Sequence, residues 1–243
     1  MIPSIKPPAA APEIDYPDSD GQPMGETGWH IAAILYLYGA LRDHFAHRDD
    51  VYVAADMFLY YQEGLPSAVK APDCMVIFGV PSTPERGSFK TWVEAAAPTV
   101  IFEITSESTF RVDVGEKLDV YAQLGVPEYY VFDPLSSCFD APLFGYRLRD
   151  GRYEQAPLEA DGGLTSPALG LRLVPEEALL RLIDLQTGRP MLTGQEKSAE
   201  VNAERQRAKQ ERQRADALAA EVEQLRALLA GRDPKPETWT TED

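Results

Sequence analysis

The chain has few of the side chains that form covalent cross-links or perform nucleophilic catalysis. Two of its 243 residues are cysteines, Cys74 and Cys138, which cannot form a disulfide framework and which fit a reducing compartment. A catalytic serine needs a histidine as its general base, and all three histidines of the chain lie on or beside one predicted helix near the N-terminus. The sequence therefore argues against a disulfide scaffold, a serine hydrolase and a zinc site built from a Cys/His cluster.

Long apolar runs are also missing. No stretch is long enough to cross a bilayer, and the N-terminus has no basic segment followed by an apolar one. Together with the cysteine content, this predicts a cytoplasmic protein that does not interact with membranes.

Positive charge is scarce. The chain has 23 Lys and Arg residues against 39 Asp and Glu residues, and its formal net charge is −16. Binding nucleic acid through a broad basic surface requires many phosphate contacts, and this composition argues against such a surface. A nucleic-acid enzyme of this charge would need a local basic patch. The nearest candidates in sequence to the motifs described below are Lys70, Arg86, Lys90 and Arg111.

Composition divides the chain into four parts. Residues 1–25 are rich in Pro, Ala and Asp without periodicity, which predicts a flexible arm. Residues 26–190 have the alternating apolar patterns of a globular domain, and residues 191–231 have the composition of one long helix. Residues 232–243 are predicted to be a disordered tail.

The globular part is predicted to be an α/β domain of the α+β kind, with a mixed β-sheet flanked by helices. Its expected elements are a helix from Glu26 to about His47, a strand over 51–61, two strands near Asp73 and Glu103, a strand within 125–134, a hairpin turning at Asp150-Gly151, and two strands at 169–174 and 179–185 that complete the sheet.

Two carboxylates fall in segments that otherwise resemble strands buried on both faces. Asp73 opens the run APDCMVIFGV, and Glu103 lies inside APTVIFEITSEST. A carboxylate in such a strand is costly unless a cation or hydrogen-bond donors compensate it. If the two strands pair antiparallel, the start of the first lies beside the end of the second. We therefore expect Asp73 and Glu103 to meet.

The next predicted helix supplies a cation. Asp113, Lys117, Val120 and Leu124 recur at helical spacing along one side, so Lys117 is expected to point at the sheet. Two carboxylates and a lysine then converge. This cluster fits either a metal-dependent active site or a buried ion network without a metal. Oxygen ligands favour magnesium, with manganese as the alternative ion.

These residues belong to a longer series of motifs. In chain order the motifs are APDCMVIFGVP, FKTWVE, FEITSEST, the spaced Asp113 and Lys117, and GVPEYYVFDP. The series resembles the Uma-two-like restriction endonucleases of the PD-(D/E)XK nuclease superfamily, over roughly Gly21 to Arg189. The resemblance implies a restriction-endonuclease-like fold and metal-dependent hydrolysis of phosphodiester bonds, with DNA as the expected substrate.

The resemblance also implies roles for individual residues. Asp73 corresponds to the motif aspartate and Glu103 to the motif glutamate, and both would bind the metal. Thr105 departs from the pattern, because it occupies the position of the superfamily's usual lysine. Lys117 on the following helix is the replacement candidate, and Asp113 either orients it or is only its i,i+4 salt-bridge partner.

The first helix offers two supporting candidates. In many nucleases of this superfamily an acidic residue of the first helix joins the metal site, which points to Glu26 or His30. The competing interpretation is structural. His30 would then be a core histidine with a backbone partner, and Glu26 a first-turn residue favoured by the helix dipole.

The long C-terminal helix is predicted to associate with a second copy of itself. Val201, Ala208, Ala215, Val222 and Leu229 repeat every seven residues, and Leu218 and Leu225 add a second seam position near the end. We expect a coiled coil and a homodimer. An alternative to the endonuclease is therefore an inactive nuclease-fold module that assembles complexes through this helix. A sugar-cleaving carboxylate pair is disfavoured, since it would give Lys117 no role.

Overall fold

The structure is a computed structural model that describes residues 14–17 and 27–230. The chain separates into two compact units, residues 1–193 and residues 194–243. The predicted flexible arm over 1–25 lies outside the described residues except for 14–17. The predicted disordered tail over 232–243 lies outside them entirely.

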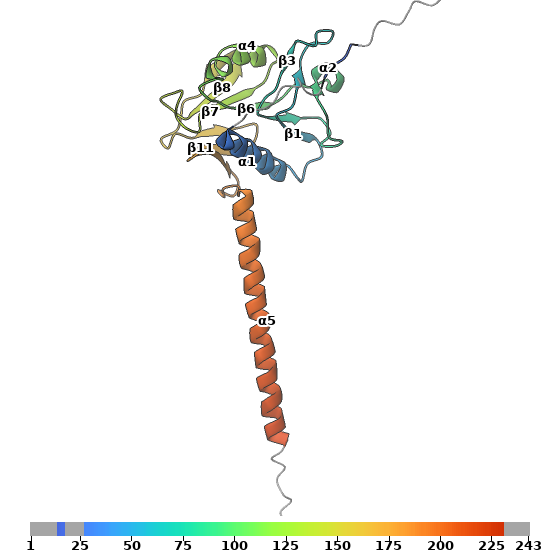
Figure 1. Cartoon of the computed structure of the whole chain (residues 1–243), viewed down its shortest axis with the longest axis vertical. Helices are drawn as coiled ribbons and strands as arrows, with labels where there is room; N and C mark the ends of the chain where they lie inside the picture. Colours follow the sequence, from blue (N-terminus) through green and yellow to red (C-terminus); the bar gives the residue numbers. More distant parts are fainter. Residues whose placement is uncertain (1–13, 18–26, 231–243) are drawn as a thin grey trace, which may run out of the picture. The chain divides into compact units, whose positions relative to one another are not determined.

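A six-stranded mixed sheet forms the centre of the first unit (Figure 1). In spatial order its strands are β1 (Val51–Ala55), β4 (Cys74–Phe78), β6 (Val100–Ile104), β7 (Glu128–Phe132), β8 (Leu143–Arg149) and β9 (Arg152–Gln155). Strands β6 and β7 are parallel, and all other neighbours are antiparallel. The predicted mixed sheet is thus confirmed, as is the hairpin at Asp150-Gly151 between β8 and β9.

Two separate apolar cores cover the faces of this sheet. Side chains alternate along a strand, so Phe102 and Ile104 of β6 face one core while Ile101 and Glu103 face the other. Helix α1 (Gly28–His44) covers the first face, where its Leu37 is fully buried. Helix α4 (Glu116–Gln123) covers the second face (Figure 1). The helix predicted from Glu26 to about His47 is therefore confirmed over Gly28–His44.

The last strands of this unit do not join the central sheet, contrary to the sequence prediction. Strands β10 (Leu164–Ser166), β11 (Leu171–Glu176) and β12 (Leu179–Asp184) form a separate antiparallel sheet. Leucines of β11 and β12 pack in the same core as α1. Burial alternates along β11, which is typical of a sheet with one face in the core. This sheet covers α1 instead of extending the central sheet, whose strands β6 and β7 are buried on both faces.

The predicted strand over 51–61 is in fact two strands in different sheets. After β1 the chain turns at Asp56, whose φ of 48° is incompatible with a continuous strand. The backbone N–H of Asp56 donates to the carbonyl oxygen of Pro72 over 3.1 Å. The chain continues as β2 (Leu59–Tyr60), which lies between β3 (Val69–Lys70) and β5 (Phe89–Lys90) in a small third sheet. Helix α2 (Thr91–Glu94) follows β5.

The predicted helix containing Asp113 and Lys117 is also divided. Helix α3 (Phe110–Asp113) ends before Gly115, and α4 begins at Glu116. A Cβ atom on Gly115 would lie 2.6 Å from the carbonyl oxygen of Arg111, so this close turn requires glycine. Asp113 and Lys117 nevertheless remain neighbours across the break.

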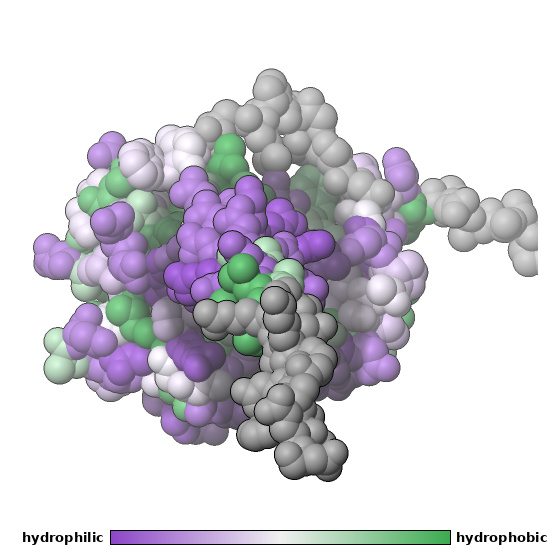
Figure 2. Space-filling view, turned by 90° about the horizontal axis from the view of Figure 1, so that it is seen from below, coloured by the Kyte–Doolittle hydropathy of each residue, from purple (hydrophilic) through white to green (hydrophobic). Residues whose placement is uncertain are grey.

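The second unit contains one described element, helix α5 (Gly194–Ala230) of 37 residues, which confirms the predicted long helix. In Figure 2 its residues are mostly hydrophilic, with hydrophobic ones gathered where its described part ends. Residues at the predicted seam are exposed, including Leu218 at 61% and Leu225 at 54%. Within the described part of the chain, no helix combines the length and apolar character needed to cross a membrane.

Candidate active site

Asp73 and Glu103 meet, as the antiparallel pairing predicts. Strands β4 and β6 pair Cys74 with Phe102, which places the preceding Asp73 next to Glu103. Asp73 Oδ2 accepts a hydrogen bond from the backbone N–H of Ile104 over 2.6 Å. Glu103 Oε2 accepts one from the backbone N–H of Asp73 over 3.4 Å. The side chain of Glu103 is 1% exposed and that of Asp73 is 17% exposed, so only one of the two carboxylates reaches solvent.

Lys117 extends from α4 to the same place. Its Nζ lies 2.8 Å from Glu103 Oε2 and 3.0 Å from Asp113 Oδ1. Thr105 donates its hydroxyl hydrogen to Asp113 Oδ2 over 2.8 Å. The residue at the superfamily's usual lysine position therefore positions Asp113, which in turn lies against the lysine of the following helix. The structure brings Asp73, Glu103, Lys117, Asp113 and Thr105 into one cluster.

His30 approaches this cluster from the opposite face of the sheet. Its Nε2 lies 3.1 Å from Asp73 Oδ1, and its side chain is 10% exposed. The imidazole thus contacts a site carboxylate, which makes the metal-site interpretation of the first helix geometrically possible for His30. Glu26, the other candidate from that helix, lies outside the described residues.

Tyr121 is a site residue that the sequence analysis missed. Its hydroxyl donates to Glu103 Oε1 over 2.8 Å, and the residue is fully buried. Tyr121 lies one helical turn after Lys117, on the side of α4 that faces the sheet. The i,i+4 spacing from Lys117 could have predicted that Tyr121 faces the same site. A buried tyrosine, however, is usually a packing residue.

Negative charge exceeds positive charge within the cluster. Lys117 pairs with two carboxylates, those of Glu103 and Asp113, and a third carboxylate, that of Asp73, lies beside Glu103. Burial and then the charge of Asp73 raise the pKa of Glu103 well above its usual range, although Lys117 opposes the shift. Burial lowers the pKa of Lys117, but the attraction of Glu103 and Asp113 outweighs it and the pKa is raised. Lys117 is therefore protonated at neutral pH.

Cys74 lies directly beside this cluster but is not a nucleophile. Burial, followed by the negative charges of Asp73 and Glu103, raises the pKa of its thiol far above the ordinary value. It is a fully buried residue of β4.

The donor set fits a hard divalent cation. Carboxylate oxygens are the ligands that magnesium and manganese prefer, and the excess of negative charge between Asp73 and Glu103 favours an added cation. Within the described residues, no group of three or more His, Cys, Asp and Glu side chains is already arranged around a metal position. A cation here would rely on these two carboxylates together with backbone carbonyl groups and water.

The basic residues nearest in sequence are already engaged by acidic ones in two cases. Arg86 makes two hydrogen bonds with Glu94, of 2.7 and 3.0 Å. Lys70 Nζ lies 2.5 Å from Glu116 Oε1. Two of the four candidates for a local basic patch, Arg86 and Lys70, are therefore paired with carboxylates.

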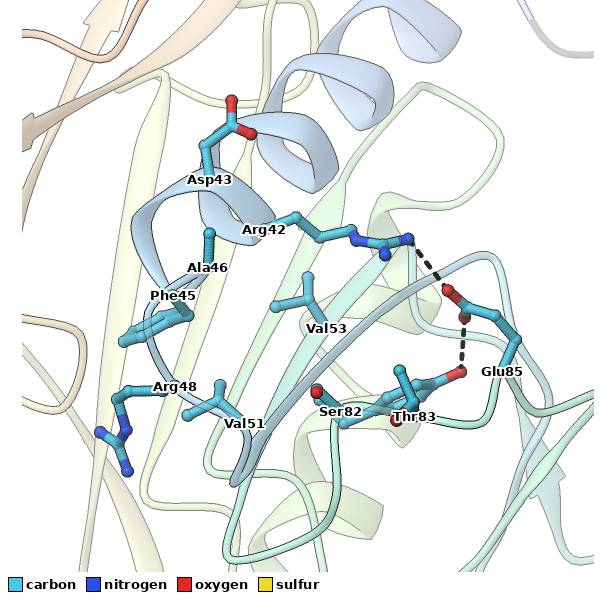
Figure 3. A pocket seen from close by; sticks show the side chains of 11 residues that line it. Arg42, Asp43, Phe45, Ala46, Arg48, Val51, Val53, Ser82, Thr83 and Glu85 are labelled. Carbon is cyan, nitrogen blue, oxygen red and sulfur yellow. Dashed lines mark hydrogen bonds and ion pairs between the residues drawn. The ribbon is translucent and has the colours of Figure 1, made fainter.

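One cavity adjoins the cluster, and another lies far from it. The adjoining cavity has a volume of about 390 Å³ and is lined by His30 and Thr105 among others. The distant cavity, of about 360 Å³, lies at the other end of α1, where Arg42 binds Glu85 (Figure 3). His30 and Arg42 are twelve residues apart on this helix, which corresponds to about 18 Å along its axis. The second cavity is therefore separate from the carboxylate cluster.

The first unit is thus an α/β domain with helices on both faces of a mixed sheet, with Asp73 just before β4, Glu103 on β6 and Lys117 on α4. The chain belongs to the Uma2 family, described as "Putative restriction endonuclease", whose sequence model matches residues 8–176.

A solved structure is also similar to the chain. It is the crystal structure of a protein titled a "putative nuclease belonging to DUF820 from Anabaena variabilis ATCC 29413". Its sequence identity to this chain is 17%, the similarity covers 69% of this chain and 92% of that chain, and the TM-score is 0.49. No match was found among curated proteins.

Proposed function

We propose that the protein is a metal-dependent endonuclease that hydrolyses phosphodiester bonds of nucleic acid, with DNA as the substrate. The observation on which this rests is the cluster of Asp73, Glu103 and Asp113 at the end of the strand pair β4 and β6, where Lys117 pairs with Glu103 and Asp113 and leaves Asp73 without an ammonium partner. A purely structural ion network would balance its charges, because an unpaired buried carboxylate is costly. The membership of the restriction endonuclease family supports the same conclusion.

The proposed metal ligands are Asp73 and Glu103. When bound there, Mg²⁺ or Mn²⁺ supplies positive charge next to the scissile phosphate and lowers the pKa of water. His30 holds Asp73 Oδ1, and Tyr121 holds Glu103 Oε1, so each carboxylate has a fixed orientation.

Lys117 has a separate role in this proposal. Because its raised pKa keeps it protonated, it can donate hydrogen bonds but cannot act as a base. It would position the attacking water or stabilise negative charge that develops on the phosphate. Asp113, itself held by Thr105, keeps the ammonium group in place.

The test is cleavage of supercoiled and single-stranded DNA with magnesium or manganese. Asp73→Asn, Glu103→Gln and Lys117→Met remove one charge each while keeping the approximate side-chain volume. Each is expected to lower the cleavage rate by about 100-fold or more, which is typical for loss of a metal ligand or a charge-stabilising group.

The matched control is Asp119→Asn, an exposed carboxylate on the same helix as Lys117. It should leave the rate unchanged. Retention of cleavage by correctly folded Glu103→Gln and Asp73→Asn would contradict the proposed site. Absence of cleavage by the wild type with every substrate and metal would contradict the enzyme.

The second candidate function is an inactive nuclease-fold module that assembles through α5. The observation in its favour is the row of exposed apolar residues at heptad spacing on α5. In that case the cluster would be a buried ion network, and self-association would persist without metal or DNA binding. For both candidates we propose a homodimer. We also propose a cytoplasmic location, and the two free cysteines support that location.

A further inference from the structure

We infer that the cavity adjoining the carboxylate cluster binds an unpaired nucleobase, with Trp29 as its stacking platform. The inference deepens the proposed nuclease function, since it names the kind of strand that this site accepts. The cavity volume of about 390 Å³ lies within the range of about 300–1,000 Å³ that is usual for small-ligand sites. His30 and Thr105 belong to both the cavity wall and the cluster, so a base bound here lies next to its own backbone phosphate at the cluster.

The charge of the cavity wall excludes a phosphate as its occupant. Among the described residues that line it there is no Lys or Arg, and the only carboxylates are Glu107 and Asp133. An anionic group would therefore meet negative charge without a counterion. A neutral heterocycle with amino and carbonyl groups meets no such barrier.

Hydroxyl groups dominate the polar part of the wall. They belong to Thr27, Thr105, Ser106, Ser108, Thr109 and Ser137. Ser106 Oγ lies 2.9 Å from Ser108 Oγ and 3.2 Å from Thr109 Oγ1, and in each pair either atom can be the donor. Such hydroxyls can rotate to match either a donor or an acceptor on a base edge.

Two exposed apolar side chains complete the wall. Trp29 is 57% exposed and Leu135 is 59% exposed, although both belong to the cavity lining. An indole ring in this position offers a face on which any base can stack, and stacking of this kind tolerates different sequences. The packing of α1 depends on its residues that face the core, and Trp29 is not one of them.

Asp133 provides an independent sign of a missing ligand. The residue is 1% exposed and lines the cavity. Its Oδ2 accepts hydrogen bonds from the backbone N–H groups of Cys138 and Phe139, over 2.7 and 3.3 Å. Its Oδ1 is buried and has no hydrogen-bond partner among the described residues. A small shift of the cavity wall would open this oxygen to a donor such as the exocyclic amino group of a base, which would supply that partner.

A base inside a duplex is stacked and paired, and it reaches such a cavity only after it is extruded from the helix. The cavity therefore favours single-stranded or locally unpaired nucleic acid over intact duplex. Stacking also offers affinity that does not depend on a basic surface, which this chain of net charge −16 lacks.

The test is binding of a mixed-sequence single-stranded oligodeoxynucleotide, without divalent metal so that cleavage does not interfere. The same strand annealed to its complement, and the same strand with abasic positions, are the comparison probes. Trp92→Phe combined with Trp239→Phe leaves Trp29 as the only tryptophan of the three in the chain. Its fluorescence should be quenched by the single strand but much less by the duplex or the abasic strand. Trp29→Ala should weaken single-strand binding about tenfold or more, and Trp29→Phe should restore most of it.

Leu35→Ala is the matched control, because Leu35 is exposed to 63% on the same helix but does not line this cavity. Equal binding of all three probes, unchanged binding by Trp29→Ala, or no binding at all would overturn the inference. Cleavage assays on the same proteins separate it from the proposed function. Cleavage without Trp29-dependent binding would refute the base site alone, and Trp29-dependent binding without any cleavage would refute the nuclease alone.

Discussion

Thr105 occupies the position at which the family resemblance leads us to expect a lysine. Two contacts, from Thr105 to Asp113 and from Asp113 to Lys117, connect this position to a lysine of another element. Thr105 directly follows β6 and is buried, and its hydroxyl binds Asp113. Asp113 then contacts Lys117, whose ammonium group reaches Glu103 from α4. A lysine from another element, α4, thus supplies the positive charge beside Glu103.

The Lys117 ion pairs predict a large and specific effect on stability. Lys117→Met leaves Glu103 and Asp113, which are 1% and 2% exposed, without their counterion. We expect the free energy of unfolding to fall by about 3 kcal/mol, as measured by urea denaturation at neutral pH. The loss should shrink as the pH falls through the raised pKa of Glu103, about 8, because protonation of this buried carboxyl group removes its uncompensated charge.

Lys70→Met provides the control for this measurement. The Lys70 side chain is 18% exposed, close to the 16% of Lys117, but its partner Glu116 is 62% exposed. Solvent compensates the remaining carboxylate, so the loss should be below about 1 kcal/mol. Equal decreases in the free energy of unfolding for the two variants would contradict the prediction that the buried ion pairs of Lys117 contribute more than the exposed pair of Lys70.

Among the helices and strands, α1 has the widest influence on the site. It packs between the central sheet and the sheet formed by β10, β11 and β12, and its first turns contain both Trp29 and His30. The hydroxyl of Tyr36 connects α1 to the smaller sheet. It donates to the carbonyl oxygen of Met191 over 3.1 Å and accepts from the backbone N–H of Leu182 over 3.0 Å.

Tyr36→Phe tests this connection without removing the buried ring. It leaves the backbone groups of Leu182 and Met191 without these hydrogen bonds, so the free energy of unfolding should decrease by about 1–3 kcal/mol in urea denaturation. Tyr38→Phe is the matched control on the same helix. Among the described residues the Tyr38 hydroxyl accepts one hydrogen bond, from the exposed Arg42 over 2.6 Å, and its loss should cost less than about 0.5 kcal/mol. An equal cost for both variants would argue against the connection.

For the chain as a whole, self-association is expected to depend on α5. The apolar residues at its seam are exposed in a single chain, and a second copy would bury them. Leu218→Glu together with Leu225→Glu places charges in that seam. We expect the full-length protein to change from a dimer to a monomer in analytical ultracentrifugation, while the unfolding of the first unit is unchanged.

Ala220→Glu together with Ala227→Glu adds the same charges to the outer face of the same heptads. This pair should leave the dimer intact, because the outer positions do not contact the partner helix in a coiled coil. A wild-type protein that is monomeric, or a dimer that survives both pairs of substitutions, would exclude α5 as the dimerisation element.

The sequence by itself determined the features that depend on local periodicity and on pairing of neighbouring strands. The antiparallel register of β4 and β6 makes Asp73 and Glu103 neighbours, and helical spacing directs Lys117 towards the sheet. The positive φ angles of Asp150 and Gly151 match the predicted tight hairpin. The motif series also identified the family correctly.

Only the tertiary structure decided how segments distant in sequence lie against each other. It divided residues 51–61 between two sheets at Asp56, and it placed β11 and β12 over α1 in a sheet of their own. It also brought His30 to Asp73 and a cavity lined by Trp29 to the side of the cluster. Alternation and helical spacing specify which face of an element is apolar, but not which other element covers that face. That choice depends on how all the buried faces pack together, and no single segment determines it.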